Sequence, residues 1–275
     1  MKNKQLTDII IYPIKSLGGI HLTNVKLTQR GLQHDRRWML VNDRNHFLTI
    51  RQHPEFLHFE LSQEDDGFVI THRIKKTTLK IPFTISSGNT VEVKIWDDMV
   101  EALEAEEKYH VWFSEQLGQN CKLVYIPEEA PRRVEADWVK EEHHVSFADA
   151  YPYLIVGEST LADLNSKLEE KITMQRFRPN LVFNGGEAYE EYVWKDIAIG
   201  NGLMQCIKPC TRCIVTTMDP ETTKAGKEPL KTLFKQKIND KMVFGENAIA
   251  MNDAEIAICD EIVVKTTKQS PYEPI

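Results

Sequence analysis

The stretch IKPCTRCIVTTMDPET, residues 207–222, carries the most distinctive motif of the chain. Its Cys210 and Cys213 form a C-x-x-C pair, a spacing found in zinc sites, in redox pairs and in plain buried cysteines. A structural zinc site needs four ligands, and the sequence has no second such pair. The β-branched residues 214–217 predict a strand after Cys213, whereas a redox pair lies at the start of a helix. Zinc and redox chemistry are therefore the weaker interpretations.

Positive charge flanks the two cysteines of this motif. Lys208 and Arg212 lie on either side of Cys210 and favour the thiolate, the form that binds soft metals. A single thiolate beside an arginine suits a metal that arrives with an anionic organic cofactor. Such a cofactor would supply the remaining ligands, which explains why the motif lacks them.

The composition of the whole chain is that of an ordinary globular protein. It has 275 residues, of which 41% are hydrophobic and 27% are charged, with a net charge of −7. An acidic chain repels phosphate backbones, so we expect no nucleic-acid partner. No apolar run approaches the ~20 residues needed to cross a bilayer, and residues 1–16 are too polar for a signal peptide. Five cysteines, an odd number, fit a reducing compartment, so a cytoplasmic protein without a membrane anchor is expected.

Short apolar segments between turn signals predict a chain that is mostly β with some helix, an α+β fold. Strands are predicted at residues 7–12, 25–27, 38–42, 47–49, 56–61, 68–71, 79–85, 91–95, 123–126, 153–156, 181–183, 197–199, 203–207, 214–217, 249–251 and 261–265. Helical spacing predicts helices at 101–117, 159–170 and 229–236. The charged residues 127–144 are interpreted as a linker or mobile loop.

Separated segments of the chain resemble one known family, in the family's order. KPCTRCIVTTMDP (208–220), RFRPNLVFNGG (176–186) and FADAYPYLIVGESTLADLN (147–165) resemble a MOSC domain. IYPIKSLGGI (11–20) and GLQHDRRWMLV (31–41) resemble the β-barrel domain that precedes it in many members. The members most similar in pattern are the amidoxime-reducing components and their bacterial counterparts, which are molybdenum enzymes. The resemblance implies an N-terminal β-barrel-like domain over residues 1–125 and a MOSC β-barrel domain with peripheral helices over residues 126–268.

The resemblance also implies a molybdenum cofactor and the residues that hold it. Cys213 corresponds to the protein thiolate that binds molybdenum beside the dithiolene of the pterin, whereas Cys210 is not a ligand. Asp149 corresponds to a position near the pterin or the open side of the metal, and is either catalytic or a structural cap. The cofactor-binding residues implied in this way are Lys15, Ser16, Arg36, Arg178, Asn180, Thr211 and Arg212.

Local geometry gives expectations for some of these residues. Arg36 and Arg37 are adjacent, so on a strand they point to opposite faces and one of them can face the cofactor. The resemblance implies that this residue is Arg36. Arg178 and Asn180 share a face if their segment is extended around Pro179. Residues 244–247, Phe-Gly-Glu-Asn, resemble a late loop of the family that lines the cofactor.

The implied activity is a molybdenum-dependent reduction of N-hydroxylated compounds, namely amidoximes, hydroxylamines and N-hydroxy nucleobases, to amines. The chain shows no G-x-G-x-x-G motif and no iron–sulfur cysteine set, so we expect a separate reductase of flavin, ferredoxin or cytochrome type. An alternative is a sulfur carrier in which Cys213 holds a persulfide, as suggested by MOSC relatives fused to cofactor sulfurases and by the family's association with pyridoxal phosphate enzymes. A non-catalytic binding module is the third possibility.

Overall fold

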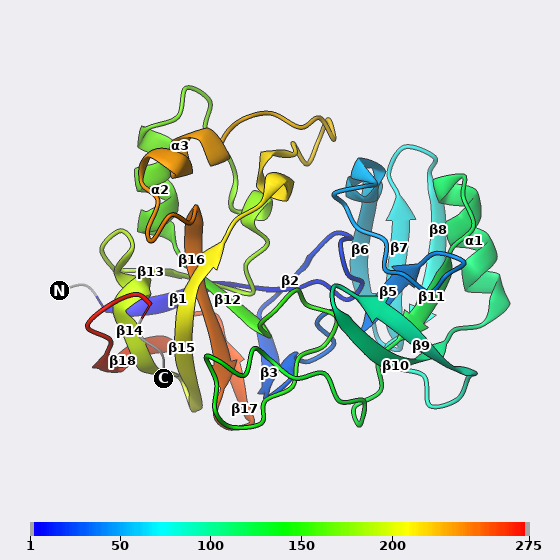
Figure 1. Cartoon of the computed structure of the whole chain (residues 1–275), viewed down its shortest axis with the longest axis horizontal. Helices are drawn as coiled ribbons and strands as arrows, with labels where there is room; N and C mark the ends of the chain where they lie inside the picture. Colours follow the sequence, from blue (N-terminus) through cyan, green and yellow to red (C-terminus); the bar gives the residue numbers. More distant parts are fainter. Residues whose placement is uncertain (1–2, 273–275) are drawn as a thin grey trace.

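A closed β-barrel occupies one end of the molecule (Figure 1). The computed structural model describes residues 3–272. Eight strands pair in the order β13-β12-β16-β15-β14-β18-β1-β2, and an additional pairing of β13 with β1 closes all of them except β2 into the barrel. These strands are β1 (Lys4–Ile11), β2 (Ile20–Leu22), β12 (Tyr153–Gly157), β13 (Leu181–Asn184), β14 (Trp194–Ile199), β15 (Gly202–Thr211), β16 (Val243–Ala250) and β18 (Glu261–Thr267).

The first strand of the chain closes this barrel. β1 pairs antiparallel with β13, and its Ile9 lies opposite Leu181. Both side chains are fully buried, so the long-range pairing is supported by apolar packing. Because β1 completes a barrel whose other long strands all follow residue 150, the division of the chain after residue 125 stays a prediction.

The other end of the molecule contains smaller antiparallel sheets and one helix (Figure 1). A four-stranded sheet has the order β5-β11-β10-β9, and a three-stranded sheet has the order β6-β7-β8. A third small sheet, β17-β3-β4, lies beside the barrel. These strands are β3 (Asn24–Thr28), β4 (Gly31–Leu32), β5 (Trp38–Val41), β6 (Phe59–Glu64), β7 (Gly67–His72), β8 (Thr77–Pro82), β9 (Thr90–Ile95), β10 (Asp98–Glu104), β11 (Lys122–Tyr125) and β17 (Ala254–Ala257).

One apolar core extends through both ends of the molecule. The same cluster contains Ile9 and Phe183 of the barrel and Trp38, Phe59 and Phe113 of the other end, all of them almost completely buried. Interiors packed in this way resist deformation, so the two ends have a defined relative position. The prediction of a mostly β chain with some helix is confirmed.

The strand predicted at residues 214–217 is wrong, because these residues form a 3-10 helix, η4 (Ile214–Thr217). The backbone N–H and the Oγ1 of Thr216 both donate to the Cys213 carbonyl, at 3.1 and 3.0 Å. Thr217 Oγ1 donates to the Ile214 carbonyl at 2.8 Å. Threonine hydroxyls that bind nearby carbonyls stabilise a turn in place of a strand. The predicted strand was the reason for disfavouring a redox role of Cys210 and Cys213, so that reason no longer holds.

The helix predicted over residues 101–117 is wrong in its first part. Residues up to Glu104 belong to β10, where Val100 and Ala102 alternate with exposed side chains. The helix α1 (Glu107–Leu117) begins later and ends at Gly118, whose positive φ of 66° permits the αL cap. The remaining helices are α2 (Glu158–Ser166) and α3 (Leu230–Lys235), with 3-10 helices η2 (Met174–Phe177) and η3 (Glu190–Val193). Within residues 3–272, no helix is long and apolar enough to span a membrane.

Other segments differ from the prediction in conformation or in packing. Residues 47–49 form no strand, and Pro54–His58 form a 3-10 helix, η1, so that the following strand begins only at Phe59. Residues 127–144 lack helix and strand, as predicted, but they are packed against the protein. Val134 and Val139 are buried together with Tyr151 and Ile249.

Candidate functional site

A cavity of about 760 Å³ lies between the barrel and the smaller sheets. All of the site residues proposed from the sequence line it: Lys15, Ser16, Arg36, Asp149, Arg178, Asn180, Thr211, Arg212 and Cys213. They come from loops after β1 and before β5 and β12, from the segment before β13, and from the end of β15. The structure thus brings together residues that are far apart in the sequence.

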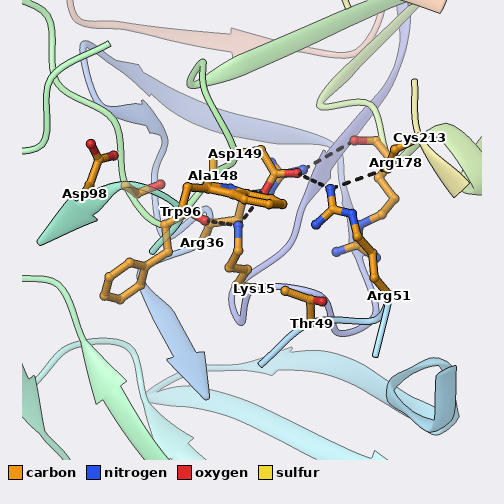
Figure 2. Close-up of polar contacts among 12 residues, drawn as sticks. Lys15, Arg36, Thr49, Arg51, Trp96, Asp98, Ala148, Asp149, Arg178 and Cys213 are labelled. Atoms are coloured by element: carbon orange, nitrogen blue, oxygen red, sulfur yellow. Dashed lines mark hydrogen bonds and ion pairs between the residues drawn. The ribbon is translucent and has the colours of Figure 1, made fainter. Parts of the chain in front are cut away.

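Cys213 lies where β15 has ended and η4 begins, and its side chain is partly exposed to the cavity. Arg51 Nη2 donates to Cys213 Sγ at 3.4 Å (Figure 2). The flanking cations of the motif bind elsewhere: Arg212 Nη1 lies 3.0 Å from Cys210 Sγ, and Lys208 pairs with Glu135. The expectation that these two neighbours provide the positive charge is therefore corrected for Cys213, where Arg51 provides it.

Arg51 also contacts Asp149, which is the centre of a charged network. Its Oδ1 lies 2.5 Å from Lys15 Nζ and 3.3 Å from Trp96 Nε1, and its Oδ2 lies 3.2 Å from Arg51 Nη2. Figure 2 shows the carboxylate between Lys15 and Arg51. Although burial raises its pKa, the charges of Lys15 and Arg51 hold the pKa of Asp149 well below its usual range. Asp149 is therefore ionised at neutral pH.

Lys15 is almost fully buried, with 5% of its surface exposed. Its Nζ donates to the Phe147 carbonyl at 2.7 Å as well as to Asp149. Burial lowers the pKa of Lys15 to about 8, and the charge of Asp149 limits the decrease. The neighbouring Ser16, whose φ is 72°, lies in the same loop and lines the cavity beside it.

Arg132 fixes the loop that carries Asp149. Its Nη1 donates to the carbonyls of Ser146 and Ala148, at 2.6 and 2.5 Å, and its Nη2 donates to the Asp149 carbonyl at 3.0 Å. The guanidinium is buried and pairs with Asp98 at 2.9 Å. Arg132 lies in the charged segment that the sequence presented as a linker, so its structural role was missed.

Arg36 and Arg178 lie on the ring of Tyr12. Their guanidinium carbons are 4.6 and 4.1 Å from the ring centroid. Arg36 also pairs with Asp35, at 2.6 Å, and its Nη1 donates to Asn180 Oδ1 at 3.2 Å. Among the residues that the structure describes, no carboxylate pairs with Arg178. Burial lowers the pKa of Arg178 to about 10, yet it remains charged and unneutralised at neutral pH.

The backbone expectations for these arginines are corrected. Arg36 has a φ of 50° in a turn before β5, so it and Arg37 diverge from a turn, not from a strand. Arg178 also has a left-handed φ, 54°, as the residue that ends η2, so its segment is not extended. Asn180 is buried, and its amide connects β1 to β12 by donating to the Ile10 carbonyl and accepting from the Leu154 N–H.

The remaining candidates lie around the rim. Thr211 ends β15 and lines the cavity beside Arg212, whose Nη2 donates to the Phe177 carbonyl at 2.6 Å. Residues 244–247 were expected as a loop but form part of strand β16. Of these four, only Asn247 lines the cavity. Glu246 is fully buried and pairs with Lys268 at 2.6 Å.

Sequence analysis also missed Arg51 and Trp96, which line the cavity and contact Asp149. Arg51 lies in a loop whose neighbours carry no recognisable pattern. Trp96 offered one signal, since a tryptophan is unusual in a two-residue turn between strands.

Within residues 3–272, no group of three or more His, Cys, Asp or Glu side chains is placed to hold a metal ion. The Cys213 thiol contacts one cation, Arg51, and Lys15, Arg36 and Arg178 line the same cavity. Such a donor set fits a metal that is already bound to an anionic organic group.

Comparisons with known proteins agree with the resemblance seen in the sequence. Residues 3–120 match the MOSC N-terminal beta barrel domain, and residues 142–263 match the MOSC domain. The chain is 31% identical over 276 residues to mitochondrial amidoxime-reducing component 1 of Homo sapiens, covering 94% of this chain and 82% of that protein. The same protein of Mus musculus is also 31% identical, with 94% and 81% covered. Molybdenum cofactor sulfurase of Arabidopsis thaliana is 28% identical over 263 residues, covering 87% of this chain but only 32% of that protein.

Proposed function

The chain belongs to the MOSC-domain family, and from this premise we propose that it is a molybdenum-cofactor-dependent oxidoreductase that reduces N-hydroxylated compounds to amines. The substrates proposed are amidoximes, hydroxylamines and N-hydroxy nucleobases. The human and mouse relatives are named amidoxime-reducing components, which supports this class of reaction.

One observation carries the proposal: the Cys213 thiol contacts the guanidinium of Arg51 and opens into a cavity that Lys15 and Arg178 also line. Thiolates select soft metals, and arginine and lysine select anions such as phosphate. Arg178 has no carboxylate partner among the described residues, so a buried positive charge is available for an anion. The donor set therefore fits a molybdenum cofactor with its pterin and phosphate.

In this proposal each cavity residue has a defined task. Cys213 is the metal ligand. Lys15, Arg36, Arg178 and Arg212 provide charged donors to the cofactor, and Ser16 and Thr211 provide hydroxyl groups. Asn180 contributes mainly by position, since its amide is already bonded to β1 and β12.

When bound, the molybdenum cofactor would supply the two electrons for reduction of the N–O bond. The residues of the chain bind and orient the substrate through its N–O–H group. The overall reaction consumes two electrons and two protons, breaks the N–O bond, and releases the amine form and water. Asp149, ionised and half exposed to the cavity, accepts a hydrogen bond from the substrate N–O–H. Arg51 holds this carboxylate beside Cys213.

The electrons come from a separate reductase in this proposal. The sequence contains neither a nucleotide-binding G-x-G-x-x-G motif nor the cysteine set of an iron–sulfur cluster. A flavin reductase, with a ferredoxin or a cytochrome, is the proposed donor.

A second candidate is a sulfur carrier with a persulfide on Cys213. The similarity to molybdenum cofactor sulfurase favours it, because that match covers 87% of this chain. A persulfide carrier has no need for the cations of Lys15, Arg36 and Arg178, which line the cavity. We therefore prefer the oxidoreductase.

The test is to analyse protein made in cells that synthesise the cofactor. We expect about one molybdenum per chain, a fluorescent pterin after oxidation, and reduction of benzamidoxime when reduced viologen is the electron donor. NADH alone should give no turnover until a reductase is added. Protein that carries a persulfide but neither molybdenum nor pterin would establish the second candidate instead.

A further inference from the structure

Trp96 occupies the two-residue turn between β9 and β10, at the rim of the cavity. Its φ is +54°, in the left-handed region that bulky side chains rarely adopt. Glycine, asparagine or aspartate normally occupies a positive-φ position in such a turn. A tryptophan at this position has an unfavourable backbone conformation, so the reason for its presence lies in its side chain.

The Trp96 side chain is held by three contacts within the site. Its ring centroid lies 4.6 Å from the guanidinium carbon of Arg51 and 4.9 Å from the ring of Phe47. Its Nε1 donates to Asp149 Oδ1 at 3.3 Å. These contacts direct the indole toward the charged network that ends at Cys213 (Figure 2).

The indole nevertheless remains open to the cavity. Trp96 keeps 40% of its surface exposed, although it is among the largest apolar side chains of the protein. The same Arg51 that contacts the indole also contacts Cys213, at 3.4 Å. The open aromatic surface and the proposed metal ligand are therefore separated by one side chain.

We propose that Trp96 determines substrate specificity, by providing a flat surface that favours aromatic, conjugated N-hydroxylated compounds over small aliphatic ones. Aromatic rings prefer offset or edge-to-face arrangements with one another, and such a pair adds to the burial of apolar surface. This inference rests on the proposed function, because it assumes that the cavity admits an N-hydroxylated substrate.

The test measures binding, without turnover, of benzamidoxime and of acetamidoxime to the cofactor-loaded protein. Calorimetry in the absence of any electron donor gives both dissociation constants for the wild type, Trp96→Ala and Trp96→Phe. Met99→Ala is the matched control, because Met99 is 53% exposed on the same hairpin and does not line the cavity.

We expect the wild type to bind benzamidoxime about tenfold more tightly than acetamidoxime. Trp96→Ala should remove most of this preference by weakening the aromatic compound alone. Trp96→Phe should keep most of it, and Met99→Ala should not change it. An unchanged ratio of dissociation constants in Trp96→Ala, or no binding of benzamidoxime to the wild type, would overturn the inference.

A parallel assay with reduced viologen distinguishes this inference from the proposed function. If neither amidoxime is reduced but the binding preference depends on Trp96, the proposed activity fails and the aromatic binding surface stands. If both are reduced at rates and KM values that Trp96→Ala leaves unchanged, the activity stands and the role of Trp96 is refuted.

Discussion

Arg51 bridges Asp149 and Cys213, although Cys213 lies 162 residues after Arg51 in the chain. The same Nη2 atom is 3.2 Å from Asp149 Oδ2 and 3.4 Å from Cys213 Sγ. One guanidinium therefore connects the carboxylate proposed to orient the substrate to the thiol proposed to bind the metal.

Removal of this bridge should reduce activity more than stability. Arg51→Ala removes hydrogen bonds to charged groups, each of which contributes about 1.5–3 kcal/mol, so we expect kcat/KM to fall about tenfold or more. Arg51→Lys keeps the charge but not the fork, and should recover part of the loss. Arg44→Ala, in an exposed turn of the same end of the molecule, is the control. Viologen-driven turnover of Arg51→Ala within twofold of the wild type would contradict this.

The two cysteines of the motif should behave differently. Cys213→Ser replaces a soft ligand by a hard one, so molybdenum-dependent turnover should be lost. Cys210→Ser should keep a substantial part of the activity, because Cys210 contacts Arg212 and not the charged network of Asp149. Molybdenum content and turnover are measured for both variants. Equal loss of turnover in both, with the metal retained in both, would reject Cys213 as the single ligand.

The cations of the cavity should control how much cofactor the protein retains. Lys15→Ala and Arg178→Ala each remove a charged donor, so affinity for the cofactor should fall about tenfold to a hundredfold. Pterin content under limiting cofactor is the measurement. Lys26→Ala is the control: Lys26 lies on β3 and forms an exposed ion pair with Asp253, so its loss should leave the pterin content unchanged. Full pterin content in both cavity variants would show that these side chains do not hold the cofactor.

Glu191 should make stability depend on pH. Its carboxyl is completely buried, and burial raises its pKa from 4.5 to about 7. The folded state binds the proton of Glu191 more tightly than the unfolded state does. The contribution of Glu191 to the free energy of unfolding is therefore fully present below pH 4.5 and is lost as the pH rises to 7. The loss is roughly 3 kcal/mol, since one pKa unit corresponds to about 1.4 kcal/mol.

Glu191→Gln mimics the protonated carboxyl, including its contacts with Thr160 Oγ1 and the Gly157 N–H. The free energy of unfolding of this variant should therefore lack the decrease between pH 4.5 and 7. Urea unfolding at pH 5 and pH 8 compares the two proteins. Parallel pH dependences of wild type and variant would show that Glu191 does not cause the effect.

Much of the site could be predicted from local sequence. The KPCTRC, YPIKS, HDRRW, FADAY and RFRPN segments identified nine residues, and all nine line one cavity. Backbone conformation was predicted less well. Residues 214–217 form a 3-10 turn because threonine hydroxyls bind nearby carbonyls, a local preference that competes with the β propensity of the same residues.

From its residues alone, the chain could be recognised as rich in β-strands, with Cys213 in its most distinctive motif. The cation that contacts the thiol, the strand that closes the barrel and the place of Trp96 at the cavity depend on contacts between distant segments. The reason is the distance along the chain over which each interaction acts. Strand and turn preferences depend on a few neighbouring residues, whereas these contacts form only after distant segments pack together. Arg51 and Asp149, 98 residues apart, show no relation in the sequence, yet the packed core places them within 3.2 Å of each other.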